Sequence, residues 1–212
     1  MLPSYYTVKG YGENEIEIER SRFIAHVARA ETADEALDFI QKIKKKHSNA
    51  THNCSAYLIG ENDQIQKAND DGEPSGTAGV PILEVLKKKK LKDTVVVITR
   101  YFGGIKLGAG GLIRAYGRAT SEGLQATGIV ERKLVTVMKT KIDYTLLGKV
   151  ENELRSSIYT LKEIQYLDTV TVETFVEENQ TGAFTDWMTE LTNGTGEITL
   201  GDSLYLEEEV KH

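Results

Sequence analysis

The hydrophobic pattern at the start of the chain has a period of two and then changes to the helical period. Residues 14–28 predict two short strands, because isoleucine alternates with glutamate there and an apolar run follows. A capping box of Thr32 and Glu35 precedes the helical period, and lysines crowd its last turns, where cations suit the helix dipole. We therefore expect a helix over 33–47, with the period carried by Ala36, Leu37, Ile40 and Ile43.

Further strand and helix signals continue to about residue 127. Residues 53–59 predict a strand, and 64–68 is expected to pair with it, whereas 69–79 has no period and predicts a loop. Pro81 stands where a helix can begin. The β-branched run Val95–Thr99 is typical of a central strand buried on both faces. The helical stripes are Ile82, Leu83 and Leu86, and then, after a glycine loop at 103–111, Leu112, Tyr116, Ala119 and Gly123.

After Gly128 the pattern begins again and predicts a second domain. Strands are expected at 134–143 and 197–206, with a hairpin from 162–168 and 170–177 between them. One helix is marked by Leu147, Val150, Leu154 and Ile158, and another by Phe184, Trp187, Met188 and Leu191. The order β-α-β-β-α-β is that of the ferredoxin-like fold. We therefore predict an α+β protein with domains at 1–132 and 133–212.

Charge differs between the two predicted domains. The chain has 212 residues, of which 40% are hydrophobic and 27% are charged, with a net charge of -6. Residues 1–132 carry 19 Lys and Arg against 17 Asp and Glu, whereas residues 133–212 carry 7 against 15. Because the acidic second part would repel a phosphate backbone, any nucleic-acid contact is expected on the first part.

The chain carries no signal for a membrane or for export. No apolar run approaches the length of a membrane span, and the N-terminal residues lack the basic and apolar blocks of a secretory signal. Cys54 is the single cysteine, so no internal disulfide can form. We expect a cytoplasmic protein, because the cytoplasm keeps thiols reduced.

Glycine is concentrated in two segments, 69–81 and 95–119, which together hold nine glycines. Glycine at this density weakens helix and strand interiors, so it commonly marks backbone that another molecule approaches closely. We interpret these segments as one functional surface.

The glycine loop at 103–111 leads from the predicted central strand into a helix. Free N–H groups at a helix N-terminus favour an anion, and Lys106 and Arg114 could add charge. The loop is not a P-loop, and Ile113 stands where a dinucleotide fingerprint requires its third glycine. The alternative is a tight turn that allows close packing of strand and helix.

Three residues at the end of the central strand, Arg100, Tyr101 and Phe102, form a second candidate group. Arginine can bind phosphate or carboxylate through two hydrogen bonds, and exposed aromatic rings can stack on bases. Alternatively, one aromatic ring lies in the core and Arg100 pairs with an acid of the 69–81 segment. We favour this ion pair, which would join the acidic loop to the strand.

The acids Asp70, Asp71 and Glu73 could bind magnesium or act as general acid and base, but acids beside glycine and proline are also ordinary turn residues. The polar cluster Thr51–Cys54 could face the same cleft. His52 and Cys54 resemble a thiol and base pair without an evident third member. The histidines and the cysteine show no zinc-ligand spacing.

Three motifs resemble the IMPACT family, in its bacterial YigZ/YvyE-like branch. They are DDGEPSGTAGVPIL (70–83), VVVITRYFGGIKLGAGGLIRAY (95–116) and ATHNCSAY (50–57), and the resemblance covers nearly the whole chain. It implies a two-layer α/β first domain like those of ribosomal proteins and elongation factors (ribosomal protein domain 2-like) and a ferredoxin-like second domain. Both are similar to domains of translational GTPases, although no GTPase domain is present. These likenesses imply contact with RNA or the ribosome.

We hypothesise a non-enzymatic regulator of translation that binds RNA, the ribosome or a translation-related protein, without a cofactor or metal. The alternatives are a small hydrolase or phosphotransferase that uses Asp70, Asp71 and Glu73, and a protein–protein interaction module. The lysine runs 42–46 and 87–90 are either solvated helix ends or non-specific RNA contacts. The candidate ligand-binding residues are His52, Asp70, Asp71, Glu73, Ser75, Thr77, Arg100, Tyr101, Phe102, Gly103, Gly104, Lys106, Gly108, Gly110, Gly111, Arg114 and Arg118.

Overall fold

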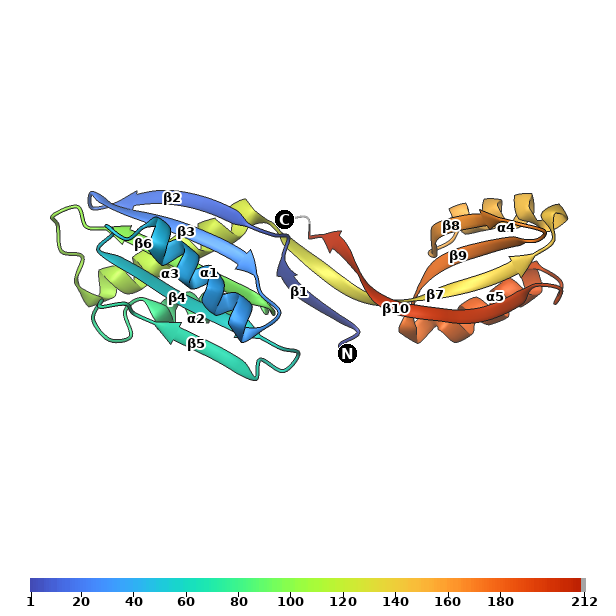
Figure 1. Ribbon diagram of the computed structural model, residues 1–212, viewed down its shortest axis with the longest axis horizontal. Helices are drawn as coiled ribbons and strands as arrows, with labels where there is room; N and C mark the ends of the chain where they lie inside the picture. Colours follow the sequence, from blue (N-terminus) through green and yellow to red (C-terminus); the bar gives the residue numbers. More distant parts are fainter. Residues whose placement is uncertain (211–212) are drawn as a thin grey trace. The chain divides into compact units, whose positions relative to one another are not determined.

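The computed structural model describes residues 1–210, and the chain divides into two compact units, whose elements are labelled in Figure 1. The first domain comprises Tyr5–Arg132 and residues 208–210. The second comprises Met1–Ser4 and Lys133–Glu207. Because both combine sheet with helix, the predicted α+β class is confirmed. No local pattern in the sequence indicated that the first four residues belong to the second domain.

Five antiparallel strands form the sheet of the first domain, and β6 lies at its centre, as predicted. The strands, in their order across the sheet, are β2 (Gly12–Ile18), β3 (Ser21–Arg29), β6 (Thr94–Tyr101), β4 (His52–Ile59) and β5 (Ile65–Asn69). In this register Arg100 of β6 lies between Phe23 of β3 and His52 of β4.

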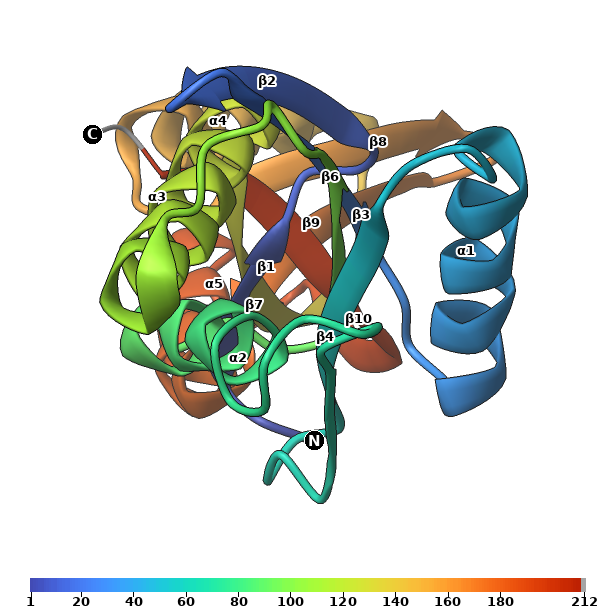
Figure 2. The same ribbon diagram turned by 90° about the vertical axis from the view of Figure 1, so that its left-hand side faces the viewer.

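Helices cover both faces of this sheet. Figure 2 shows α1 (Ala33–Lys46) on one face, and α2 (Gly79–Lys88) and α3 (Gly108–Thr127) on the other. The domain therefore has three layers, where a two-layer domain was expected. The cause is the apolar character of β4 and β6, whose residues are buried on both faces and need cover on both.

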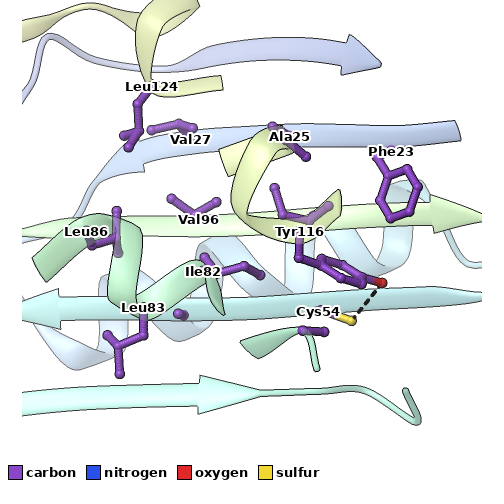
Figure 3. Packing of buried hydrophobic residues seen from close by; sticks show 14 of the residues in the cluster. Phe23, Ala25, Val27, Cys54, Ile82, Leu83, Leu86, Val96, Tyr116 and Leu124 are labelled. Atoms are coloured by element: carbon purple, nitrogen blue, oxygen red, sulfur yellow. Dashed lines mark hydrogen bonds between the residues drawn. The ribbon is translucent and has the colours of Figure 1, made fainter. Parts of the chain in front are cut away.

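The larger core of the first domain lies between the sheet and the helices α2 and α3 (Figure 3). Phe23 and Tyr116 pack edge to face there, with ring centroids 5.3 Å apart. The predicted stripe of α3 is buried. The helix begins at Gly108, so the glycine loop is shorter than the predicted 103–111.

A sheet with the strand order β10-β7-β9-β8 forms the second domain, together with two helices, and this order is the ferredoxin-like one. A further strand, β1 (Ser4–Val8), also pairs with β7. The elements are β7 (Ile129–Ile142), α4 (Tyr144–Ser156), β8 (Thr160–Tyr166), β9 (Val170–Glu177), a 3-10 turn η1 (Glu178–Gln180), α5 (Thr181–Leu191) and β10 (Glu197–Glu209).

Two predictions for the second domain were wrong in detail. Ile158, expected on a helix, lies beyond the end of α4 and is 78% exposed, because the helix ends at Ser156. Strand β7 begins at Ile129, five residues before the predicted start, directly after Gly128 ends α3 with a φ of 84°. Glycine tolerates this positive φ, so β7 can follow α3 directly, without a linker.

Within residues 1–210 no helix is both long and apolar enough to cross a membrane.

Candidate functional site

A buried ion pair joins the acidic loop to the end of β6. The Nη1 of Arg100 donates to Oε1 of Glu73 at 2.7 Å, and the two residues are only 5% and 8% exposed. The hydroxyl of Tyr116 donates to the same oxygen at 2.7 Å. The prediction that Arg100 pairs with an acid of this loop is confirmed, with Glu73 as the partner.

Arg100 is also enclosed by aromatic rings. Its guanidinium lies 5.4 Å from the ring centroids of both Phe23 and Phe102, and its Nη2 donates to Ser21 Oγ at 3.3 Å. These contacts hold the planar group in one orientation. Its Nε–H is buried and has no acceptor among residues 1–210. Both terminal nitrogens of Arg100 are therefore engaged, whereas its Nε is a buried donor without a partner.

Asp70 ties the acidic loop to the start of α2. Its carboxylate accepts the backbone N–H groups of Gly76, Ala78 and Gly79 at 2.8, 3.1 and 2.8 Å. Burial opposes ionisation, but these three donors outweigh it and hold the pKa of Asp70 below its ordinary value. Ala78, the N-cap residue, has no side chain that could cap α2, so Asp70 caps it from a distance in sequence.

Asp71 is engaged in the same structural way. Its carboxylate accepts the Nζ of Lys44 and the backbone N–H of Asn53, each at 2.6 Å. Burial alone would raise the pKa of Asp71, but the hydrogen bonds from these two partners lower it by more, so the pKa lies below its ordinary value. Neither Asp70 nor Asp71 is therefore free for metal binding or proton transfer. Within residues 1–210, no group of three or more His, Cys, Asp or Glu side chains is placed to hold a metal ion.

The geometry of His52 and Cys54 does not fit a thiol and base pair. His52 Nδ1 donates to the backbone oxygen of Asp71 at 2.8 Å, which leaves its Nε2 at 3.6 Å from Oε2 of Glu73. The thiol of Cys54 lies in the core, where it donates to Asp70 O and contacts the hydroxyl of Tyr116 (Figure 3). Burial raises the pKa of Cys54 to about 12, so the thiolate needed for covalent catalysis is scarce at neutral pH.

The start of α3 is open. No side chain caps this 20-residue helix, whose N-cap residue is Leu107, so its first N–H groups lack partners within the helix. Gly108 has a φ of 70°, and a Cβ built on it would meet nothing within 4 Å. Glycine is required there by the backbone conformation and leaves the helix end accessible.

The other glycines of this loop have different roles. A Cβ on Gly103 would lie 2.0 Å from the backbone oxygen of Arg20, so only glycine permits this close approach. Gly104 has a φ of 88° with open space around it. In the first turn of α3, a Cβ on Gly110 would lie 3.5 Å from Arg114, and one on Gly111 would crowd Leu107 at 2.9 Å.

A pocket of about 420 Å³ brings the two glycine-rich segments together. The acidic loop contributes Glu73 and Pro74, and the end of β6 contributes Arg100 and Phe102, whose ring is 46% exposed. The remaining lining comes from β4 with its preceding residue and from the start of α3, namely Thr51, His52, Lys106, Leu107, Gly108, Ala109 and Leu112.

Several sequence candidates lie elsewhere. Tyr101 points to the opposite face of the sheet, where its hydroxyl bonds to His47 Nδ1 at 2.9 Å and to Asn49 Oδ1 at 3.3 Å. Adjacent strand residues face opposite ways, so Arg100 and Tyr101 cannot share a site. Thr77 is buried and donates to Pro74 O, while Ser75 is exposed, and neither lines the pocket.

Two open grooves beside α2 and α3 contain the remaining cations. The first, of about 490 Å³, lies between α2 and α3, and the second, of about 540 Å³, follows the other side of α3. We call Lys88, Lys89, Lys106, Arg114 and Arg118 the basic face; Arg114 and Arg118 line both grooves. Arg118 pairs with Glu122 at 2.7 Å. The other four have no ion-pair partner within the described chain.

Sequence reasoning missed several residues that shape the pocket. Ser21 and Phe23 come from a segment that carried no functional signal, and Tyr116, although it lies in the 95–119 segment, was not among the candidates. Tyr116 was identified only as part of an apolar stripe, although its polar hydroxyl needs a partner when buried. Leu107 and Leu112, which line the pocket, gave no separate signal.

Comparison with known proteins relates both parts of the chain to known families. Residues 19–124 match the Impact N-terminal domain, and residues 140–195 match a domain of unknown function, DUF1949. The chain is 68% identical over 212 residues to the IMPACT family member YvyE of Bacillus subtilis, covering all of this chain and 98% of that protein. It is 35% identical over 195 residues to an IMPACT family member of Haemophilus influenzae, covering 91% of this chain and 95% of that one.

A more distant likeness extends to proteins of eukaryotes and to a solved structure. Protein IMPACT of Rattus norvegicus is 37% identical over 94 residues, which are 42% of this chain and 29% of that protein. A crystal structure titled only as a hypothetical protein matches 95% of this chain and 99% of its own, with a TM-score of 0.61 and 26% identity. Both domains and nearly the whole length are thus shared with bacterial relatives, and the chain belongs to the IMPACT family.

Proposed function

We propose that this protein is a translation-associated factor that binds RNA through the basic face of its first domain. The observation that carries the proposal is the set of four unpaired cations, Lys88, Lys89, Lys106 and Arg114, which line two adjacent grooves with Arg118. Cations without an acidic partner are free to contact phosphates and to release counterions. Membership of the IMPACT family supports a translation-related role, and we infer that this role is performed in the cytoplasm.

The shape of the face suits a nucleic-acid backbone. Gly117 lines the first groove, where a Cβ built on it would lie 4.0 Å from Val85, so its lack of a side chain leaves room in the groove. The acids near the face are few: Glu84 pairs with Lys87, Glu122 pairs with Arg118, and Glu19 lines the second groove. A strand of RNA can therefore follow the helices with its phosphates near the cations.

The test is the salt dependence of RNA binding, measured by fluorescence anisotropy with a short single-stranded RNA. The logarithm of the affinity should fall with the logarithm of salt concentration, with a slope of about -0.7 for each phosphate contacted. The double variant K89E/R114E should weaken binding and flatten this slope. Both side chains are exposed, so the fold should be unaffected.

The matched control is K42E/K45E, which makes the same change of charge with exposed lysines of α1, on the other face of the sheet. Equal weakening by both double variants would indicate a net-charge effect and contradict the proposal. Arg100 is unsuitable for charge reversal because the change would place two acids against each other in the core. Capture of partners that resists nuclease would instead favour a protein–protein module.

A further inference from the structure

The pocket at the start of α3 combines one cation of the basic face, Lys106, with features that the proposed RNA contact does not use. An uncapped helix N-terminus, the exposed cation of Lys106 and the exposed ring of Phe102 line one cavity of about 420 Å³. The volume lies in the range of small-molecule sites. A helix end alone is a weak indication of a ligand, so the other groups in the pocket decide whether it is built for one.

Arg100 supplies the second, independent indication. It lines the pocket, is 5% exposed, and its buried Nε–H donates to no acceptor within residues 1–210. Buried polar groups nearly always have partners, and an unmet donor on a charged group is costly. The Glu73 carboxylate and the Ser21 hydroxyl take only the two terminal nitrogens. A small displacement of the exposed Phe102 ring, which lies over the guanidinium, would let a ligand oxygen reach this N–H and accept its hydrogen bond.

The charge balance of the pocket favours an anion. Glu73 neutralises Arg100, and His52 faces Glu73 with its Nε2, so these three groups nearly balance one another. Lys106 and the partial positive charge of the α3 N-terminus remain uncompensated. Glycines at positions 108, 110 and 111 add no side chain that would shield the first N–H groups. A phosphate can therefore approach the helix end directly.

We propose that this pocket binds a nucleotide through a terminal phosphate, with the base stacked on Phe102. A phosphomonoester has three acceptor oxygens and nearly two negative charges at neutral pH, which suits the helix N–H groups, Lys106 and the Arg100 Nε–H together. An internal phosphodiester offers fewer oxygens and one charge. The inference rests on the proposed function, because it assigns the end of an RNA strand, or a free nucleotide, to a separate site on the same domain.

The test titrates the full-length protein with 5′-AMP, adenosine and inorganic phosphate and follows the backbone amide signals of Gly108, Gly110 and Gly111 by NMR. AMP should shift these signals, and adenosine should not. Inorganic phosphate should shift them with an affinity weaker by about tenfold, because one base–aromatic stack contributes roughly that factor. The proposal would be overturned if AMP did not shift these amide signals, if adenosine shifted them as much as AMP, or if phosphate and AMP bound with equal affinity.

Two variants separate binding from folding. A109E places an acid in the first turn of α3, where it suits the helix dipole and should preserve or raise the melting temperature while it repels the phosphate. The control Q125E adds the same charge at an exposed site near the other end of α3, outside the pocket, and should bind AMP as the unaltered protein does. K106Q should weaken AMP binding by about tenfold, whereas K45Q, at an exposed site on α1, should not change it. AMP affinity that A109E leaves unchanged would refute the site.

RNA ends distinguish this site from the basic face. An RNA octamer with a 5′-phosphate should bind more tightly than the same octamer with a 5′-hydroxyl, and A109E should abolish that difference. If the two octamers bind equally while K89E/R114E still weakens both, the terminal-phosphate site is refuted and the RNA-binding proposal stands. If AMP binds but neither octamer responds to K89E/R114E, the RNA-binding proposal fails instead.

Discussion

Removal of the Glu73 charge should destabilise the first domain strongly. In the variant E73Q, the guanidinium of Arg100 stays in the core with 5% exposure but loses its counter-charge. Breaking a buried pair by removing one partner costs about 3–5 kcal/mol. Because the glutamine oxygen still accepts a hydrogen bond from Arg100 or Tyr116, we expect the lower end of that range. A loss of this size is a large fraction of the roughly 5–15 kcal/mol that stabilises a domain.

The position of the single tryptophan makes the assay domain-specific. Trp187 lies in α5 of the second domain, so its fluorescence during urea unfolding reports that domain, while far-UV circular dichroism reports both. In E73Q the transition of the first domain should move to lower urea with an unchanged slope, and the fluorescence transition should stay in place.

A double-mutant cycle separates the ion pair from simple loss of packing. R100M alone should also destabilise the first domain, whereas R100M/E73Q removes both charges and should cost less than the two single losses added together. A loss of stability in E73Q below about 1 kcal/mol, or a cycle in which the two losses add, would refute the view that the pair depends on mutual neutralisation in a buried site.

Four further predictions concern other groups. The pKa of Asp70 is lowered in the folded state, so its carboxylate stabilises the fold above the unfolded pKa of about 4. This stabilisation is lost as pH falls. Acid unfolding of D70N should therefore depend less steeply on pH than that of the unaltered protein. Burial lowers the pKa of His26 to about 4, so the stability of the first domain should decrease as pH falls from about 6.5 towards 4. The variant H26F should flatten that decrease. Equal dependence of stability on pH in H26F and the unaltered protein would contradict this prediction. Cys54, whose pKa burial raises to about 12, should resist iodoacetamide at pH 8 until denaturant is added, and fast alkylation of the native protein would contradict this. F184A should cost about 3–5 kcal/mol by opening a cavity in the second domain, with the shift visible in Trp187 fluorescence and no effect on the first domain.

Local periodicity accounts for most of the elements that were predicted correctly. The helical spacing in 33–47 predicted α1, because side chains three and four residues apart share one face of a helix. The continuous apolar run in β6 predicted a central strand, because only a strand covered on both faces can bury successive side chains. The order of elements after Gly128 was enough to indicate the ferredoxin-like second domain.

The errors occurred where an element depends on a partner rather than on its own pattern. Strand β1 consists of residues with little period, and it is held by pairing with β7. The end of α4 is set at Ser156, whereas the apolar spacing would also have admitted Ile158. The third layer of the first domain exists because β4 and β6 are buried on both faces and need helices on each. The apolar run in β6 indicated this burial, whereas the expected two layers came from the family resemblance.

The sequence by itself determined which segments are helical or extended, where most of their apolar faces lie, and which short region holds the glycines and charges. The contacts within that region were decided by the tertiary structure, since Arg100 meets Glu73 across 27 residues and Glu73 meets Tyr116 across 43. Sheet register places Arg100 beside the pocket and turns Tyr101 to the opposite face. Periodicity acts between near neighbours along the chain, whereas a pocket depends on side-chain directions that only the packing of distant elements sets.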